Sequence, residues 1–393
     1  MESIEQMIKR LCPGGVKWKK ISEIGTVMRG TSFQKKHFTD EGTPCIHYGQ
    51  IYTQYAHHVY ETLSFVGEEI SRSPRRAKTG ALIMATTSEN IEDVGKCIVW
   101  LGEKDIIVSN DACFIQHSLN PKYLGYLLQT GYFNAYKKKV ATGTKVIRIN
   151  ADAVADFVIP VPPLEIQNRI VEVLDKMTTL EAELEAELEA RKRQYEYYRS
   201  KLLTFSEVGG IRQVVWKKIG EICVNCDNRR KPITSGKRIP GKYPYYGASG
   251  IVDYVEGYIF DGDYLLVSED GANLLARNSP IAFSISGKNW VNNHAHVLSF
   301  ETYAERKYVE YYLNMIDLSK YISSAAQPKL NQQNLNNILI PIPPLSEQQR
   351  IVSILDRFEA LTTDLQSGLP AEIEARRQQY EYYRNKLLTF EAV

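Results

Sequence analysis

Two long stretches of the chain carry apolar residues at helical spacing. In the first, apolar side chains recur mostly every three or four positions, which places them on one face of a helix. They are Ile170, Leu174, Met177, Leu180, Leu184, Leu188, Tyr195, Tyr198, Leu202 and Phe205. Because proline fits the first turn of a helix but cannot continue one from upstream, Pro163 and Pro344 mark the two helix starts. About 40 residues at 1.5 Å each predict a first helix of about 60 Å.

The two stretches are copies of one another. Residues 194–205 and 379–390 are identical at 11 of 12 positions, and residues 159–175 and 340–356 at 11 of 17. A shorter match, Trp-Lys-Lys-Ile, begins at Trp18 and again at Trp216. Internal repetition indicates repeated structural units. The sequence therefore predicts two tandem units, each a divergent globular part followed by a nearly invariant helix.

The globular parts have a different pattern, with short β-like runs separated by Gly, Asn, Asp and Thr. In residues 22–150 these runs predict a twisted, mainly antiparallel sheet. The runs lie at 45–48, 81–84, 96–100 and 106–108, and helical spacing follows at 121–139. Residues 217–338 repeat the plan weakly, with a helix expected at 303–318. Aligning the halves matches Gly80 with Gly262, Val108 with Val291, Arg148 with Lys329, and Asn150 with Asn331.

These patterns predict an α+β chain of four segments. A short helix over residues 2–11 and the first globular domain occupy 1–158, and the first long helix occupies 159–208. The second globular domain occupies 209–339, and the second long helix 340–393.

The two apolar stripes need a partner surface, and each helix can supply it to the other. An antiparallel pair fits the connectivity, because the second globular domain must lie between the end of one helix and the start of the next. The result is a pseudo-twofold, almost circular arrangement. Two helices that do not pair would leave both stripes uncovered. The residues assigned to helix pairing or to the docking of other subunits are Leu184, Leu188, Tyr195, Tyr198, Leu202, Tyr380, Tyr383 and Leu387.

A four-residue Leu-Glu-Ala-Glu unit iterates over residues 180–191 of the first helix. Each unit adds about 6 Å to a helix and turns its end by about 40°. The repeat offset grows from 181 at the start of the second helix to 185 at its tyrosine-rich end. The second copy thus holds four extra residues, and Gly368-Leu369-Pro370 falls among them. We predict a kink or bulge there that absorbs the insertion.

Composition changes this picture little. The net charge is +2 and 24% of residues are charged, so any basic surface must be local. The chain shows no P-loop pattern, no adenine-methyltransferase tetrapeptide and no nucleophile–base assembly, so no catalytic site is expected. Cys223 and Cys226 form a lone CxxC, for which reduced thiols are favoured over a metal site. The pairs His57-His58 and His294-x-His296 favour structural roles over metal binding. No long apolar run is present, and we expect a cytoplasmic location with no membrane contact.

Basic and polar residues cluster in both globular parts, whereas the helix at 181–189 is acidic. Arginine, lysine and polar side chains supply the phosphate and base contacts of DNA-binding proteins. The alternative for any one cluster is a solvated surface. The candidate DNA contacts are Lys35, Lys36, Arg72, Arg75, Arg76, Lys78, Thr87, Ser88, Lys138, Lys145, Arg229, Arg230, Lys231, Lys237, Arg238, Tyr245, Tyr246, Arg277 and Lys329.

The motifs resemble those of the specificity subunit of a type I restriction–modification system. The resemblance rests on Pro-x-Pro-Pro-Leu-x-x-Gln-x-Arg-Ile-Val at 160–171 and 341–352, the two tyrosine-rich helix ends, the Trp-Lys-Lys-Ile entries and the Leu-Glu-Ala-Glu unit. The last of these resembles the subgroup in which a tetrapeptide repeat sets the distance between half-sites.

This resemblance implies a non-catalytic protein whose globular parts are target recognition domains, each for one half of a bipartite, asymmetric DNA site. The helices would act as spacer and dock two modification subunits that methylate adenine, and two motor–nuclease subunits would complete the complex. S-adenosylmethionine, ATP and Mg²⁺ are then expected on those partners, with no cofactor on this chain.

Two alternatives remain at this point. The chain could be an interaction scaffold that binds proteins instead of DNA, or an enzyme whose nuclease or methyltransferase site carries no recognisable motif. A steep fall of affinity with salt would distinguish DNA binding from the scaffold. Activity of the purified chain with magnesium or a methyl donor would reveal the enzyme.

Overall fold

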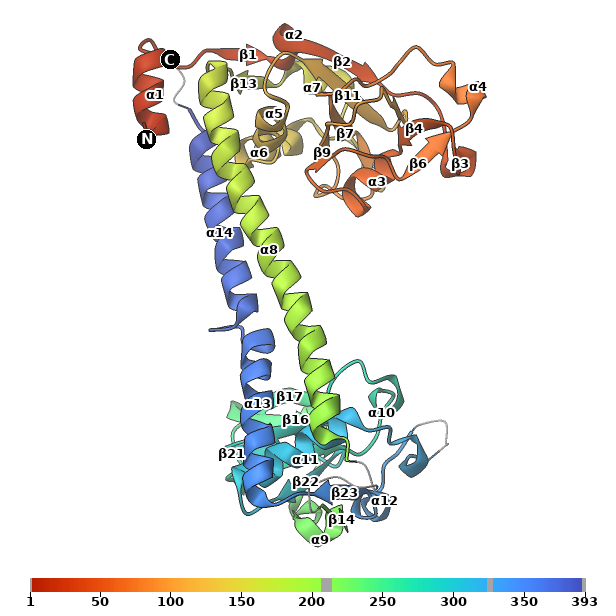
Figure 1. The fold of residues 1–393 in the computed structure, drawn as a ribbon, viewed down its shortest axis with the longest axis vertical. Helices are drawn as coiled ribbons and strands as arrows, with labels where there is room; N and C mark the ends of the chain where they lie inside the picture. Colours follow the sequence, from red (N-terminus) through yellow and green to blue (C-terminus); the bar gives the residue numbers. More distant parts are fainter. Residues whose placement is uncertain (1, 206–213, 324–327, 391–393) are drawn as a thin grey trace. The chain divides into compact units, whose positions relative to one another are not determined.

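The computed structural model describes residues 2–205, 214–323 and 328–390 and divides into two compact units (Figure 1). The first unit consists of Met1–Leu184 with Ile373–Val393, and the second of Glu185–Glu372. Each unit thus contains one globular domain and parts of the long helices. The expected boundary between residues 208 and 209 lies outside the described residues.

The globular part of the first unit alternates short strands and short helices. In chain order its elements are α1 (Ile4–Leu11), β1 (Trp18–Lys20), α2 (Ile21–Ile24), β2 (Gly25–Arg29), η1 (Lys35–His37), β3 (Phe38–Thr39), β4 (Thr43–Ile46), α3 (Tyr48–Thr53), β5 (His58–Val59), β6 (Ser64–Val66), α4 (Glu68–Ser71), β7 (Leu82–Ala85), β8 (Thr87–Ser88), β9 (Cys97–Trp100), β10 (Ile107–Val108), β11 (Ala112–His117), α5 (Pro121–Leu127), α6 (Gly131–Val140), β12 (Ile147–Arg148), α7 (Ala151–Asp156) and β13 (Val158–Pro160).

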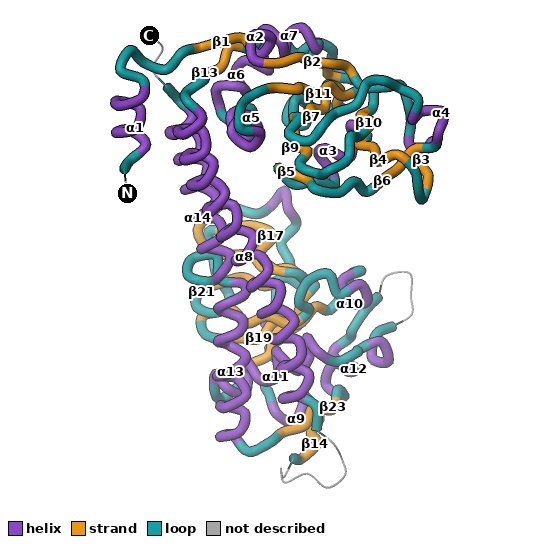
Figure 2. Tube along the Cα trace, turned by 45° about the horizontal axis from the view of Figure 1, so that its top comes forward, coloured by secondary structure: helices purple, strands orange, loops and turns teal. Residues whose placement is uncertain are grey.

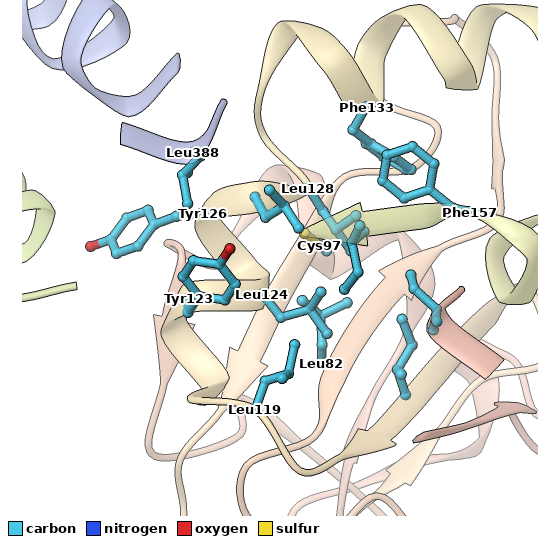
Figure 3. Packing of buried hydrophobic residues seen from close by; sticks show 14 of the residues in the cluster. Leu82, Cys97, Leu119, Tyr123, Leu124, Tyr126, Leu128, Phe133, Phe157 and Leu388 are labelled. Atoms are coloured by element: carbon cyan, nitrogen blue, oxygen red, sulfur yellow. The ribbon is translucent and has the colours of Figure 1, made fainter. Parts of the chain in front are cut away.

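Two sheets organise this unit. A five-stranded sheet has the order β2-β11-β7-β9-β5, and a four-stranded sheet has the order β10-β4-β6-β3. Only the β5–β9 and β4–β10 pairs in these sheets are parallel, which confirms the expected mainly antiparallel arrangement. The core lies between the larger sheet and helices α5 and α6. Leu82 and Leu124 belong to it, and so does Phe133, which packs against Phe157 (Figure 3). Leu388, from the end of the chain, joins the same core.

The globular part of the second unit repeats this plan. Its elements are β14 (Val215–Lys218), α9 (Ile219–Ile222), β15 (Val224–Asn225), η2 (Asp227–Arg229), η3 (Ser235–Lys237), β16 (Pro240–Gly247), β17 (Gly250–Val255), β18 (Phe260–Asp261), β19 (Tyr264–Ser268), α10 (Asn273–Ala276), β20 (Ala282–Ile285), β21 (Lys288–Val291), β22 (Ala295–Ser299), α11 (Tyr303–Met315), η4 (Ser319–Tyr321), α12 (Gln332–Asn336) and β23 (Leu339–Ile342). One sheet has the order β15-β22-β19-β20 and the other the order β17-β16-β21-β18, in which β16 and β21 are parallel, as are β4 and β10.

The repeated motifs make the same contacts in both units. Trp18 pairs with Pro160 in the β1–β13 ladder, and Trp216 pairs with Pro341 in the β14–β23 ladder. A tyrosine hydroxyl donates to the carbonyl of each of these prolines, from Tyr123 at 3.0 Å and from Tyr308 at 2.6 Å. Because these contacts join repeat residues to the globular parts, the duplication extends to the fold of both domains.

The first long helix, α8 (Leu164–Leu203), is continuous, as the apolar spacing predicts. The second is broken into α13 (Leu345–Thr363) and α14 (Leu369–Leu388), and α13 packs beside α11 in the second unit (Figure 2). In the break, the Gly368 amide donates to the Asp364 carbonyl at 3.0 Å. The predicted interruption is therefore confirmed. Pro370 occupies the first turn of α14, where a missing amide costs nothing.

Two expected elements differ from the structure. The helix predicted over 121–139 is two helices, because the buried Thr130 begins a new one: its hydroxyl donates to the Leu127 carbonyl and accepts from the Phe133 amide. The β-run predicted at 45–48 ends at Ile46, since Tyr48 begins α3. Within the described ranges, none of the helices combines the length and apolar character needed to cross a membrane.

Candidate nucleic-acid interface

The two units share an irregular stretch of backbone just before the short helices α7 and α12. In the first unit the Thr142 amide donates to the Arg148 carbonyl, and in the second the Ser323 amide donates to the Lys329 carbonyl, both at 2.9 Å. Two residues further on, Asn150 and Asn331 each cap a short helix, α7 and α12, with the side-chain oxygen. The predicted match of the asparagines is thereby confirmed in their local roles.

Backbone hydrogen bonds extend this equivalence into the sheet. The Thr86 amide donates to the Asp111 carbonyl, and the Glu269 amide donates to the His294 carbonyl, again both at 2.9 Å. Thr86 therefore corresponds to Glu269, so the sequence alignment that matched Gly80 with Gly262 is one residue out of register here. The shift arises because the second unit has one more residue between the matched glycine and the strand. Leu82 and Leu265 lie opposite the equivalent residues Ile115 and Leu298, but they follow their glycines by two and three residues.

Three polar residues occupy the equivalent positions in the first unit, and we call Thr87, Asp111 and Arg148 the first polar cluster. The Thr87 hydroxyl donates to the Asp111 carboxylate at 3.2 Å, and Arg148 lies opposite Thr87 in the β8–β12 ladder. Arg148 is exposed, and its side chain has no hydrogen bond or ion pair within the described part of the chain.

The second polar cluster consists of Asp270, His294 and Lys329. Nδ1 of His294 lies 2.9 Å from the Asp270 carboxylate, and Lys329 bridges to Asp270 through the backbone. Lys329 also pairs with Glu269 at 3.1 Å. Asp111 and His294 were not among the predicted site residues. The signal was present, because the matched stretches beginning at Val108 and Val291 contain them at the same place.

Basic segments lie beside both clusters. In the first unit, the hydroxyls of Ser73 and Thr31 are 2.7 Å apart and the Thr31 amide bonds to β10, which holds the segment 72–78 beside the strand that leads to Asp111. In the second unit, Arg230 donates to the Ala295 carbonyl at 2.8 Å, next to His294. Predicted DNA contacts therefore lie close to both polar clusters.

The predicted DNA contacts fall into three groups: exposed, partly buried, and buried or bonded within their own unit. The exposed ones are Lys35, Lys36, Arg72, Arg75, Lys78, Lys138, Lys145, Arg229, Lys231, Lys237 and Lys329. Arg76 and Tyr246 are partly buried. The side chains of the exposed group reach the solvent, although two of them have partners within the unit: Arg229 donates to the Ile259 carbonyl at 3.1 Å and lies over the Phe260 ring at 4.6 Å, and Lys329 pairs with Glu269.

The other six predicted contacts are buried or bonded within their own unit. Thr87, Ser88 and Tyr245 are buried, and the Tyr245 hydroxyl accepts from the Ile233 amide. The three arginines of this group bind acceptors within their own unit. Arg230 pairs with Glu269, Arg238 pairs with Asp253, and Arg277 donates to two carbonyls at the end of α11. Their prediction as DNA contacts rests on residue type, which does not reveal an internal partner.

A buried network of charged and polar side chains lies next to the second polar cluster. Asp227 accepts from the Val297 amide at 2.8 Å and lies 2.6 Å from Nδ1 of His296. Nε2 of His296 faces the Leu330 carbonyl at 2.7 Å, which gives this histidine the structural role expected for it. Burial opposes the charge of Asp227, but the hydrogen bonds from His296 and Val297 hold the pKa of its carboxyl below the ordinary value.

The residues assigned to helix pairing also differ in exposure. In the second unit, Tyr195 and Tyr198 lie against Phe358 of α13, with ring centroids 6.3 and 5.7 Å apart, and Leu202 is buried. In the first unit, Tyr380 is buried against Tyr126, and Leu387 is partly buried. Leu184 and Leu188 are half-buried, whereas Tyr383 is exposed.

Comparison with known proteins agrees with the duplication. The family described as "Type I restriction modification DNA specificity domain" matches residues 13–190 and again 212–375, more than half of the chain. The chain belongs to this family. Both matches include one globular domain and one long-helix segment, so the family domain occurs once per unit.

Relatives in this specificity family cover the chain in part. A putative type I restriction enzyme specificity subunit of Haemophilus influenzae is 40% identical over 183 residues, which are 46% of this chain and 47% of the relative. The EcoR124I/EcoR124II specificity subunit of Escherichia coli is 35% identical over 255 residues, 59% of this chain and 61% of the relative. The chain thus matches about half to three fifths of the length of these two relatives.

The fold is shared over nearly the whole chain. The crystal structure of a type I restriction–modification S subunit from M. genitalium superposes with a TM-score of 0.55. The match covers 96% of this chain and 97% of the other at 15% sequence identity, which shows similarity of fold.

Proposed function

We propose that this chain is the DNA-specificity subunit of a type I restriction–modification complex, in which each unit recognises one half of a bipartite, asymmetric DNA site. The observation that carries the proposal is the pair of polar clusters. The same backbone arrangement occurs twice in this chain, but it carries different polar side chains in its two copies. Recognition of a site with two different halves requires one fold that is used twice with different contact residues.

Methylation mapping in cells provides the direct test. We expect a bipartite motif of methylated adenines in cells that contain this chain and its partner subunits, and loss of that motif when the chain is deleted. Restoring the chain on a plasmid should restore the motif. An unchanged methylation map would contradict the proposal. Binding to DNA should also weaken steeply with salt, as phosphate contacts require and a protein-binding scaffold does not.

We further infer that the long helices pair antiparallel as a coiled-coil spacer that sets the distance between half-sites in a pseudo-twofold molecule. Contacts within each unit support this. Glu181 meets Arg377 in the first unit, and Tyr198 meets Phe358 in the second. From residue 181 to residue 198 of the first helix, the contacted position in the second helix falls from 377 to 358, as an antiparallel pair requires. The iterated Leu-Glu-Ala-Glu unit supports assignment to the tetrapeptide-repeat subgroup.

The helix ends supply docking surfaces for two copies of one partner. Tyr197 and Tyr382 occupy the same place in the two repeats and are 58% and 60% exposed. A lysine lies over each ring, Lys201 at 5.6 Å and Lys386 at 5.9 Å. An identical exposed patch, present twice, suits two identical modification subunits. In this proposal, S-adenosylmethionine, ATP and Mg²⁺ act on the modification and motor–nuclease subunits and this chain catalyses no step.

Replacing these tyrosines tests the docking proposal. Y382A should leave one modification subunit bound per chain, and Y197A/Y382A should leave none, because exposed aromatic side chains are frequent hot spots of interfaces. The measurement is the mass of the assembled complex by analytical ultracentrifugation. Y254A, which removes another exposed tyrosine, is the matched control and should leave two subunits bound. Full assembly of the double variant would contradict the assignment.

A further inference from the structure

The two polar clusters differ in chemistry at some positions and agree at others. Arg148 and Lys329, which correspond by their backbone bonds, are both cations. At the position shared by Asp111 and His294, a carboxylate stands in the first unit and an imidazole in the second. DNA offers the same phosphates at every site but different base edges. A position whose charge is kept suits a phosphate, and a position whose chemistry changes suits a base.

We infer that Asp111 and His294 read bases in the two half-sites and that Arg148 and Lys329 hold the adjoining phosphates. The inference rests on the proposed function and assigns residues within it. The backbone geometry supports this inference, because the Asp111 and His294 carbonyls accept equivalent hydrogen bonds from the Thr86 and Glu269 amides. The two side chains therefore leave the sheet from the same place.

Thr87 and Asp270 are positioning residues. The Thr87 residue is 8% exposed and the Asp270 side chain 16% exposed, and each contacts the reading residue beside it. The His294 side chain is 48% exposed, and its Nδ1 faces Asp270. Nε2 then remains for a base, since it has no hydrogen-bond partner in the part of the chain that the structure describes.

The chemistry of Asp111 specifies the kind of base. An ionised carboxylate only accepts hydrogen bonds, and the matching donor in the major groove is the N4 amino group of cytosine. Asparagine instead makes a pair of hydrogen bonds with adenine N6 and N7. D111N should therefore move the preference at one position of one half-site from cytosine toward adenine and leave the other half-site unchanged.

The experiment uses the full chain with its modification subunits and a plasmid library in which both half-sites are randomised, with methylation read by sequencing. D111N should change discrimination about tenfold to a hundredfold at one position of the first half-site, the range of one good base contact. H294A should relax one position of the second half-site. R148Q and K329Q should weaken methylation of all sequences alike, and each should lower the slope of log affinity against log salt by about 1.

Positioning is tested separately from reading. T87V should partly relax the position that D111N changes, and T87S, which restores the hydroxyl, should recover the original preference. Thermal unfolding establishes that each variant is folded. A uniform loss of methylation in D111N or H294A, or an unchanged profile, would overturn the inference. If the unmodified chain directs no bipartite methylation at all, the proposed function itself fails, which is a different result.

Discussion

Replacement of Asp227 with alanine is expected to lower the free energy of unfolding of the second unit by about 3–5 kcal/mol, the usual cost of removing one partner from a buried ion pair. Asp227 is buried and contacts His296 at 2.6 Å, the Val297 amide at 2.8 Å and Arg230 at 3.4 Å. Without the carboxylate, the His296 ring and the Val297 amide stay buried and lose this acceptor, whereas Arg230 keeps Glu269 and the Ala295 carbonyl. Hydrogen exchange of amides in β19 and β22 measures the unfolding of this unit directly.

The pH dependence gives the same substitution a second readout. The hydrogen bonds that Asp227 accepts overcome burial and keep its pKa low, and an ion pair with Arg230 does the same for the pKa of Glu269. A depressed pKa stabilises the fold fully above the ordinary value of about 4, and this stabilisation is lost as the pH falls from that value through the depressed pKa. Wild-type stability should thus fall below about pH 4, and D227A should lose part of this dependence. D261A, which removes an exposed carboxylate from the same unit, should shift unfolding by about 0.5 kcal/mol or less. Parallel pH curves for wild type and D227A would refute the assignment.

Deletion of residues 184–187, one Leu-Glu-Ala-Glu unit, is expected to abolish methylation of the original bipartite site and to create a new one with the same half-sites and a gap changed by about one or two base pairs. Four residues of helix span about 6 Å, and base pairs are stacked at about 3.4 Å. The helix should survive the deletion. Glu183 then stands four residues before Arg191 and can replace Glu187, which now pairs with Arg191 at 2.7 Å.

The measurement is a methylation profile over sites that differ only in the length of the gap. Substituting Glu183 with glutamine at unchanged length is the control, and it should retain the original gap because the side chain is exposed. If the deletion variant methylates the original site as before, the helix does not set the spacing. If it methylates both lengths equally, the spacer is flexible and the ruler mechanism is wrong.

Sequence and structure agree most closely in the repeated segments. The start of α8, directly after Pro163, and the break before Pro370 follow from the conformational limits of proline and from a change in repeat offset. These are local properties, which a sequence carries without reference to the rest of the chain. The match of Asn150 with Asn331 succeeded for the same reason, since a helix cap depends on its own residue and the next turn.

The candidate site was less predictable. Residue type selected Arg230, Arg238 and Arg277 for DNA, and each proved to bind an acceptor within its own unit. In the same way, Asp111 and His294 have no distinguishing composition as single residues. Their correspondence becomes clear only through hydrogen bonds to Thr86 and Glu269, which are distant in the sequence.

By itself, the sequence determined the duplication, the two long helices, the interruption of the second and the α+β class, because periodicity, proline and internal identity act over short distances. Only the tertiary structure decided which cations are exposed, which histidine is buried beside Asp227, and which residues of the two domains occupy equivalent positions. Those properties depend on pairing between strands far apart in the chain, and a shift of one residue in register exchanges the side chains that face the solvent and the core.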